Sequence, residues 1–95
     1  GERLMVRSWL DWNDRVCLLQ ARSDEGMSVP RVNAFIALIQ AGLKSAGADG
    51  EDAHRCEDWL WQQVLAAIAA GCEDAPALAR AVLQTTALAF PRWYA

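Results

Sequence analysis

Residues 49–71 read DGEDAHRCEDWLWQQVLAAIAAG, and this stretch carries signals for the beginning, the buried face and the end of one α-helix. Asp49 followed by Asp52 approximates a capping box, in which two side chains satisfy backbone N–H groups at a helix start. Glu51 adds the negative charge that a helix start favours, and Gly71 is a typical helix stop. Between these ends the apolar residues recur on one helical face: Ala53, Cys56, Leu60, Val64, Ala67 and Ile68. The pattern predicts a helix that begins after Asp49 and ends at Gly71.

The residues on either side predict three further helices, because apolar side chains recur at helical spacing and never alternate for long enough to form a strand. We expect the first from about Arg3 to Arg22, the second from near Pro30 to Gly47, and the last from Asp74 to Phe90, where Pro91 ends it. The apolar stripes of these helices are, in chain order, Met5, Trp9, Trp12, Val16 and Leu19; Val32, Phe35, Ile36, Ile39 and Leu43; and Leu78, Val82, Thr85 and Ala89.

These four helices predict an all-α fold, either a compact four-helix bundle or an irregular orthogonal helical array, with no β-sheet. We expect residues 1–95 to form one helical domain, and a fragment of a longer protein remains an alternative. The connections after the second and third helices are short, so the last three helices are expected to be antiparallel neighbours.

Gly42 inside the second helix costs about 1 kcal/mol relative to alanine and indicates a close helix crossing. Further apolar residues widen the stripe of the first helix, so this helix is expected to touch two neighbouring helices. The residues that widen the stripe are Val6, Leu10, Cys17 and Leu18.

Composition narrows the possible functions. Hydrophobic residues make up 54% of the chain and the formal net charge is −3, which indicates a globular and mildly acidic protein. An acidic balance argues against nucleic-acid binding, which needs clustered Lys and Arg. The longest apolar run, residues 64–72, is too short to span a bilayer, so no membrane association is expected. Abundant Ala and Arg with Lys44 as the only lysine points to a GC-rich bacterial genome.

No residue pattern predicts catalysis or a metal site. His54 is the only histidine, and it lies two residues from Cys56, so the two side chains face opposite sides of a helix instead of sharing a zinc ion with Cys17 and Cys72. The odd number of cysteines and the absence of CxxC predict reduced thiols in the cytoplasm. His54 and Glu57 share a helix face, but no nucleophile accompanies them. We therefore expect no enzyme activity, no cofactor and no metal.

A helix-turn-helix made of the second and third predicted helices is disfavoured for a related reason. The helix that would read the bases carries four carboxylates in its first turns against Arg55 alone, namely Glu51, Asp52, Glu57 and Asp58. Phosphates would repel such a helix. Nucleic-acid binding would have to use the arginines of the first helix, and it ranks third among the functions considered.

The five tryptophans are the most informative feature for function. Trp59 and Trp61 are two residues apart on one helix, so they cannot both point into the same core seam, and at least one is expected to be partly exposed. Exposed aromatic surface beside arginine is typical of protein interfaces. The candidate partner-binding residues are Trp59, Trp61, Trp93 and Tyr94, with Arg55 or Arg92 at the rim.

The sequence therefore predicts a small cytoplasmic helical interaction module with a regulatory, accessory or chaperone-like role. It would bind a protein partner or a second copy of itself through an aromatic and apolar patch. Two alternatives stay open. The tryptophans serve only as bulky core residues, or the chain is a helical part of a larger enzyme or maturation factor whose reactive groups lie elsewhere.

Overall fold

The computed structural model describes residues 8–22, 26–88 and 90, and these residues form helices with no strand among them. The elements are α1 (Trp9–Ala21), α2 (Val29–Ser45), α3 (Gly50–Ala69), α4 (Ala75–Leu83) and a short 3₁₀ turn, η2 (Gln84–Ala87). The predicted all-α class is therefore confirmed. Every helix in this part of the chain is too short or too polar to cross a bilayer.

Side chains that accept hydrogen bonds from the backbone mark the beginnings of the first three helices. The Ser8 Oγ accepts from the backbone N–H of Asp11, and the Ser28 Oγ accepts from that of Arg31. At α3 the capping box is complete, because each of Asp49 and Asp52 accepts a hydrogen bond from the backbone N–H of the other. These side chains satisfy N–H groups that have no partner within the helix.

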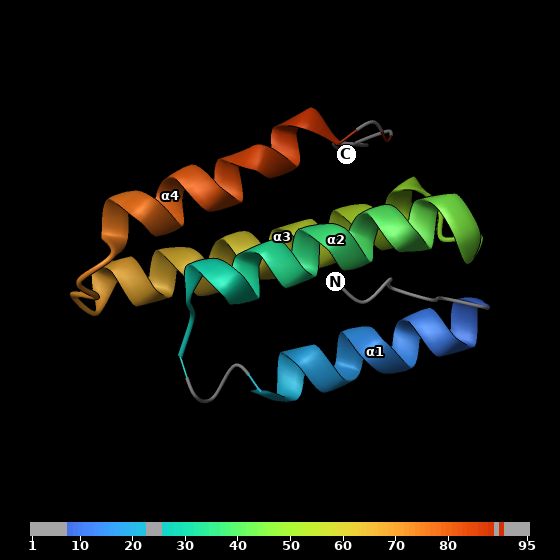
Figure 1. The fold of residues 1–95 in the computed structure, drawn as a ribbon, viewed down its shortest axis with the longest axis horizontal. Coiled ribbons are helices and arrows are strands. Elements are labelled where there is room, and N and C mark those ends of the chain that lie inside the picture. Colours follow the sequence, from blue (N-terminus) through green and yellow to red (C-terminus); the bar gives the residue numbers. More distant parts are fainter. Residues whose placement is uncertain (1–7, 23–25, 89, 91–95) are drawn as a thin grey trace.

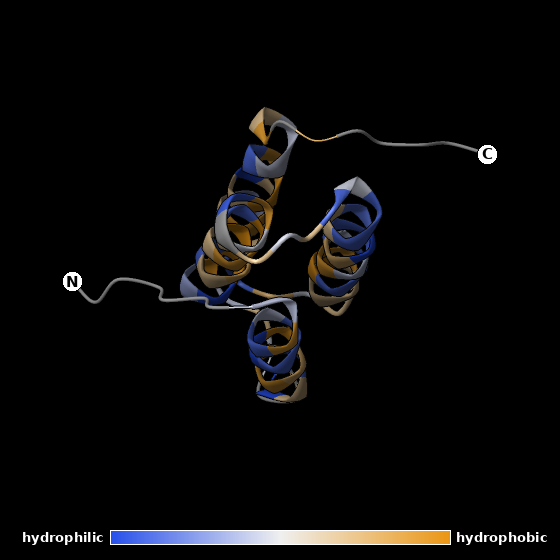
Figure 2. Ribbon diagram, turned by 90° about the vertical axis from the view of Figure 1, so that its right-hand side faces the viewer, coloured by the Kyte–Doolittle hydropathy of each residue, from blue (hydrophilic) through white to orange (hydrophobic). Residues whose placement is uncertain are grey.

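The four helices run alternately in opposite directions, and α2 is in contact with each of the other three (Figure 1). Viewed along the helices, α2, α3 and α4 group together, and α1 lies to one side, below them (Figure 2). The prediction that the last three helices are antiparallel neighbours is confirmed.

The expectation that α1 touches two neighbours is confirmed, since its main contact is with α2 and the indole N–H of Trp9 donates to Asp52 of α3. The expected widening of its buried stripe is wrong for the described residues. Leu10 and Leu18, which were expected to widen its buried stripe, are 69% and 64% exposed, and Cys17 is exposed as well. Only Trp12 and Val16 of α1 are fully buried. A groove therefore remains between α1 and α3.

The core consists of two hydrophobic clusters joined by shared side chains. One cluster holds α1 against α2 and the first half of α3, through Trp12, Val16, Leu38, Ile39 and Cys56 among others. The second cluster joins α2, the middle of α3 and α4, and its members are Val32, Phe35, Leu60, Val64, Leu78, Ala81 and Val82. Leu19 and Ile36 pack against both clusters.

Gly42 marks the close crossing of α1 and α2, as its position inside a helix predicted. A Cβ atom at residue 42 would lie 2.4 Å from the Nε1 atom of Trp12, a distance that real carbon atoms do not tolerate. The same indole is held in place because its N–H donates to the backbone carbonyl of Leu38 at 2.8 Å. The indole of Trp12 therefore occupies the space that a side chain at residue 42 would fill.

The α-helix at the end of the chain is shorter than predicted, since α4 ends at Leu83 and not at Phe90. Thr85 and Thr86 explain the difference, because their hydroxyl groups donate to the carbonyls of Val82 and Leu83 in the preceding turn. Such bonds compete with the regular helical pattern and favour a tighter 3₁₀ turn. At the other end, Asp74 occupies the predicted cap position of α4, but its side chain makes no capping hydrogen bond.

Candidate functional site

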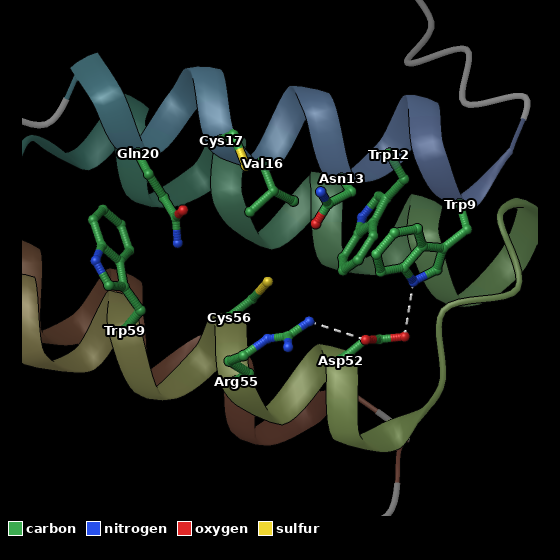
Figure 3. A pocket seen from close by; sticks show the side chains of 10 residues that line it. All are labelled: Trp9, Trp12, Asn13, Val16, Cys17, Gln20, Asp52, Arg55, Cys56 and Trp59. Atoms are coloured by element: carbon green, nitrogen blue, oxygen red, sulfur yellow. Dashed lines mark hydrogen bonds and ion pairs between the residues drawn. The ribbon is translucent and has the colours of Figure 1, made fainter.

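A groove with a volume of about 450 Å³ separates α1 from α3, and it is the candidate functional site. We call it the α1/α3 groove. Among the described residues, its walls come from α1 and α3 (Figure 3). From α1 it takes Trp9, Trp12, Asn13, Val16, Cys17 and Gln20, and from α3 it takes Asp52, Arg55, Cys56 and Trp59.

Asp52 organises one end of the groove. Its Oδ2 accepts a hydrogen bond from the indole N–H of Trp9 at 3.0 Å, and its Oδ1 accepts one from Nη2 of Arg55 at 3.0 Å (Figure 3). The carboxylate that caps α3 thus also ties α1 to α3 and positions an arginine. Because Arg55 remains mostly exposed and uses one of its five N–H donors here, it keeps donors available for another molecule.

Tryptophan rings provide most of the apolar lining. Trp12 is 1% exposed, and Trp9 packs against it with ring centroids 6.3 Å apart. At the other end of the groove, Trp59 is half-buried and packs on Phe35 of α2, with centroids 5.0 Å apart. Tilted pairs at these distances are favourable aromatic contacts. These contacts fix the rings in place, and the rings of Trp9 and Trp59, unlike that of Trp12, keep exposed surface along the groove.

Two thiols line the same groove, one from each wall (Figure 3). Burial raises the pKa of the Cys56 thiol from 9.0 to about 11, and the positive charge of Arg55 only partly opposes this effect. Cys56 is therefore a neutral, apolar part of the wall at physiological pH and not a nucleophile. Beside the thiols, the amide of Asn13 has no hydrogen-bond partner among the described residues.

The structure separates the two tryptophans that the sequence singled out. Trp59 and Arg55 line the α1/α3 groove. Trp61 instead borders an apolar hollow of about 140 Å³ between α3 and α4, and its indole N–H donates to the Thr85 hydroxyl at 2.9 Å. Both rings are partly exposed, as predicted. The other candidates, Trp93, Tyr94 and Arg92, lie outside the described residues.

His54 and Glu57, which share a helix face in the sequence, both lie near the start of α3. The Nε2 atom of His54 lies 3.3 Å from the Oδ1 atom of Asp58, so His54 pairs one turn along the helix with Asp58. Glu57, one of the four carboxylates in the first turns of this helix, is buried. Cys72 packs in the second core cluster, away from the groove that holds Cys17 and Cys56. Within the described ranges no three His, Cys, Asp or Glu side chains gather to hold a metal ion.

Sequence reasoning missed the α1 wall of the groove. Trp9, Asn13, Val16 and Gln20 follow one another at intervals of four, three and four residues, which places them along one side of the helix. The polar members of this stripe, Asn13 and Gln20, were the available signal. Two amides within an otherwise apolar stripe are typical of a surface that is only partly covered by the protein itself.

Searches of protein-family models, curated proteins and solved structures give no match to this chain. The chemistry and geometry of the site therefore carry the functional argument.

Proposed function

We propose that this chain is a small interaction module that binds another protein by accepting one of its large apolar or aromatic side chains in the α1/α3 groove. The observation that best supports the proposal is that Trp9 is 37% exposed and lines the groove, while its indole N–H is already bonded within the protein. The ring surfaces that face the groove gain free energy when a partner removes them from water. Tryptophan anchors with arginine at the rim are typical of interface hot spots.

The polar groups of the groove favour a protein segment over a purely apolar small molecule. Asn13 offers an amide that both donates and accepts, which suits a peptide backbone. Arg55, fixed by Asp52 at the rim, offers further donors to a carbonyl or a carboxylate. A second copy of the chain is a special case of such a partner, and sedimentation at two protein concentrations would distinguish it.

We also propose a cytoplasmic, accessory role in a bacterium. Its support is limited to the unpaired cysteines Cys17, Cys56 and Cys72, which suit a reducing compartment, and to the Ala- and Arg-rich composition.

The test begins with capture of the partner from extracts of the source organism, followed by affinity measurement with both purified proteins. Trp59→Ala removes a groove wall, and we expect it to weaken the complex at least about tenfold, as loss of a hot-spot residue does. Asn13→Trp fills the groove with a bulky ring and leaves the core untouched, so we expect a similar loss by obstruction. Circular dichroism should show unchanged helicity for both variants.

Two matched variants serve as controls. Trp61→Ala removes a tryptophan that is also partly exposed but lies on the other side of α3, beside the hollow between α3 and α4. Asn33→Trp adds a ring on the exposed side of α2. Both should bind the partner as the unmodified chain does. A partner that binds the Trp59→Ala and Asn13→Trp variants at full strength would contradict the proposal. Loss of binding with Trp61→Ala alone would assign the interface to the hollow between α3 and α4.

A further inference from the structure

A second hollow lies on the other flank of α1, where α1 meets α2, and it differs from the α1/α3 groove in its charge. We call it the α1/α2 hollow. Its volume is about 240 Å³, and its lining consists of Arg15, Leu18, Leu19, Arg22, Ala34 and Leu38. Leu38 is buried at its base, and Leu18 stands 64% exposed at its edge. Among the described residues no carboxylate lines it, although the chain as a whole is acidic.

The two arginines flank the apolar part of the hollow. They are seven residues apart on α1, which corresponds to two helical turns and a separation of roughly 10 Å along the axis. Among the described residues, Arg15 makes one polar side-chain contact, from its Nε–H to Asp11 at 3.3 Å. The guanidinium of Arg22 makes no hydrogen bond or ion pair with any described residue. Both side chains therefore retain N–H donors for an anionic group from another molecule.

The backbone around Arg22 is held in place by α2. Arg31, in the first turn of α2, donates from Nη1 to the backbone carbonyl of Arg22 and to that of Gly26, the latter at 2.9 Å. The first bond satisfies a carbonyl group at the end of α1 and links it to the beginning of α2, and the second reaches a carbonyl that precedes α2. The hydrogen bonds from Arg31 thus hold the end of α1 in place, and this fixes the backbone spacing between Arg15 and Arg22.

We propose that the α1/α2 hollow binds an amphipathic helix of another protein, one that presents a leucine-sized side chain between two carboxylates seven residues apart. Carboxylates at positions i and i+7 of a helix repeat the separation of Arg15 and Arg22, and an apolar residue at i+3 or i+4 lies between them on the same face. An extended strand fits poorly, since the same separation covers three residues, whose side chains alternate between opposite faces.

Fluorescence anisotropy with a labelled helical peptide tests this proposal. The probe is an alanine- and glutamine-based peptide of about 21 residues, long enough to be helical, with Glu at i and i+7 and Leu at i+3 and i+4. A matched peptide carries Lys at i and i+7. We expect the Glu peptide to bind roughly tenfold more tightly than the Lys peptide, because complementary charges select the partner. We expect the preference to shrink between about 50 mM and 500 mM salt.

Charge reversal in the protein makes the test specific to the hollow. Arg22→Glu is expected to abolish the preference for the Glu peptide and to improve binding of the Lys peptide. Arg80→Glu, an equal charge change on the exposed side of α4, should leave the preference intact. Trp59→Ala should also leave it intact, so that failure of this proposal and failure of the α1/α3 groove proposal are distinguishable.

Two results would overturn the proposal. The first is equal affinity of the two peptides, or an Arg22→Glu variant that still prefers Glu to the same extent. The second is binding to anionic lipid vesicles that depends on Arg15 and Arg22 without any peptide binding, which would assign the hollow to a membrane surface. Thermal unfolding of the Arg22→Glu variant should match that of the unmodified chain, since the side chain is exposed.

Discussion

The buried thiol of Cys56 makes stability depend on pH in an alkaline window. Burial raises its pKa in the folded chain from 9.0 to about 11. Above pH 9 the unfolded chain releases this proton while the folded chain keeps it, so deprotonation favours the unfolded state. The stability that the neutral thiol contributes is present below pH 9 and is lost as the pH rises to about 11.

We expect this loss to amount to at most about 3 kcal/mol, measured by urea unfolding under reducing conditions between about pH 8 and pH 11. The unmodified chain should lose stability more steeply than a Cys56→Ala variant, since only the former carries the buried thiol. Cys17 is exposed, so Cys17→Ala should follow the unmodified chain. Parallel curves for the Cys56→Ala variant and the unmodified chain would show that the two states have the same pKa.

Gly42 illustrates what a sequence reveals about a single residue. A glycine inside an apolar helical stripe costs stability, so its presence predicted that another element comes close. The identity of that element, the indole of Trp12, was not predictable, because the pattern in α2 contains no information about the rotamer of a residue in α1. Similarly, nothing in the sequence distinguished Glu57 from the other carboxylates in the first turns of α3, yet Glu57 is buried in the fold.

The beginning of α3 performs three tasks with one side chain. Asp52 accepts the backbone N–H of Asp49, which completes the capping box. It also accepts the indole N–H of Trp9 and a guanidinium N–H of Arg55. The helix cap and the link between α1 and α3 therefore depend on the same carboxylate.

Replacing Asp52 with alanine should consequently cost more than an ordinary surface substitution. We expect a loss of about 1–2 kcal/mol in the free energy of unfolding, the usual cost of a lost cap, together with release of the Trp9 indole. Urea unfolding measures the first effect, and the NMR signal of the Trp9 indole N–H measures the second. Glu51→Ala alters an exposed carboxylate in the same turn and should change stability by less than about 0.5 kcal/mol. Equal effects of the two substitutions would mean that the bonds of Asp52 contribute nothing to stability.

The helix boundaries show where sequence patterns are reliable and where they fail. The start of α3 was predicted from Asp49, because a capping side chain acts on the backbone beside it. The start of α2 was predicted near Pro30, and the structure places its cap at Ser28. The end of α4 was misplaced because the apolar stripe continues through Thr85, which is buried as predicted but lies in a 3₁₀ turn. A buried position at the right spacing fits either type of helix for one turn.

The position of α1 determines both candidate binding surfaces, and the sequence did not predict it. An amphipathic stripe indicates which side of a helix is buried, but not how closely a third helix approaches. Because α1 packs mainly on α2, a groove remains on its α3 side and a hollow on its α2 side. Trp59 and Arg55 were predicted as interface residues from composition, whereas Trp9, Asn13 and Arg22 became candidates only through this packing.

This arrangement predicts unequal local stability across the fold. The helix α2 contacts α1, α3 and α4, whereas the main contact of α1 is with α2 alone. Regions with fewer buried contacts open locally at a smaller free-energy cost. We therefore expect backbone amides in the middle of α1 to exchange hydrogen for deuterium roughly tenfold or more faster than those of α2 and α3, measured on the native chain by NMR or mass spectrometry.

The Asp52→Ala variant refines this expectation, because it removes the bond from Trp9 that ties α1 to α3. Exchange in α1 should become faster still, while exchange in α4, which packs on α2 and α3, should change much less. Equal protection of α1 and α2 in the unmodified chain would contradict the prediction, since α1 would then open only when the whole chain unfolds. A partner bound in the α1/α3 groove contacts α1 and α3 together, so it should slow the exchange of α1 more than that of any other helix.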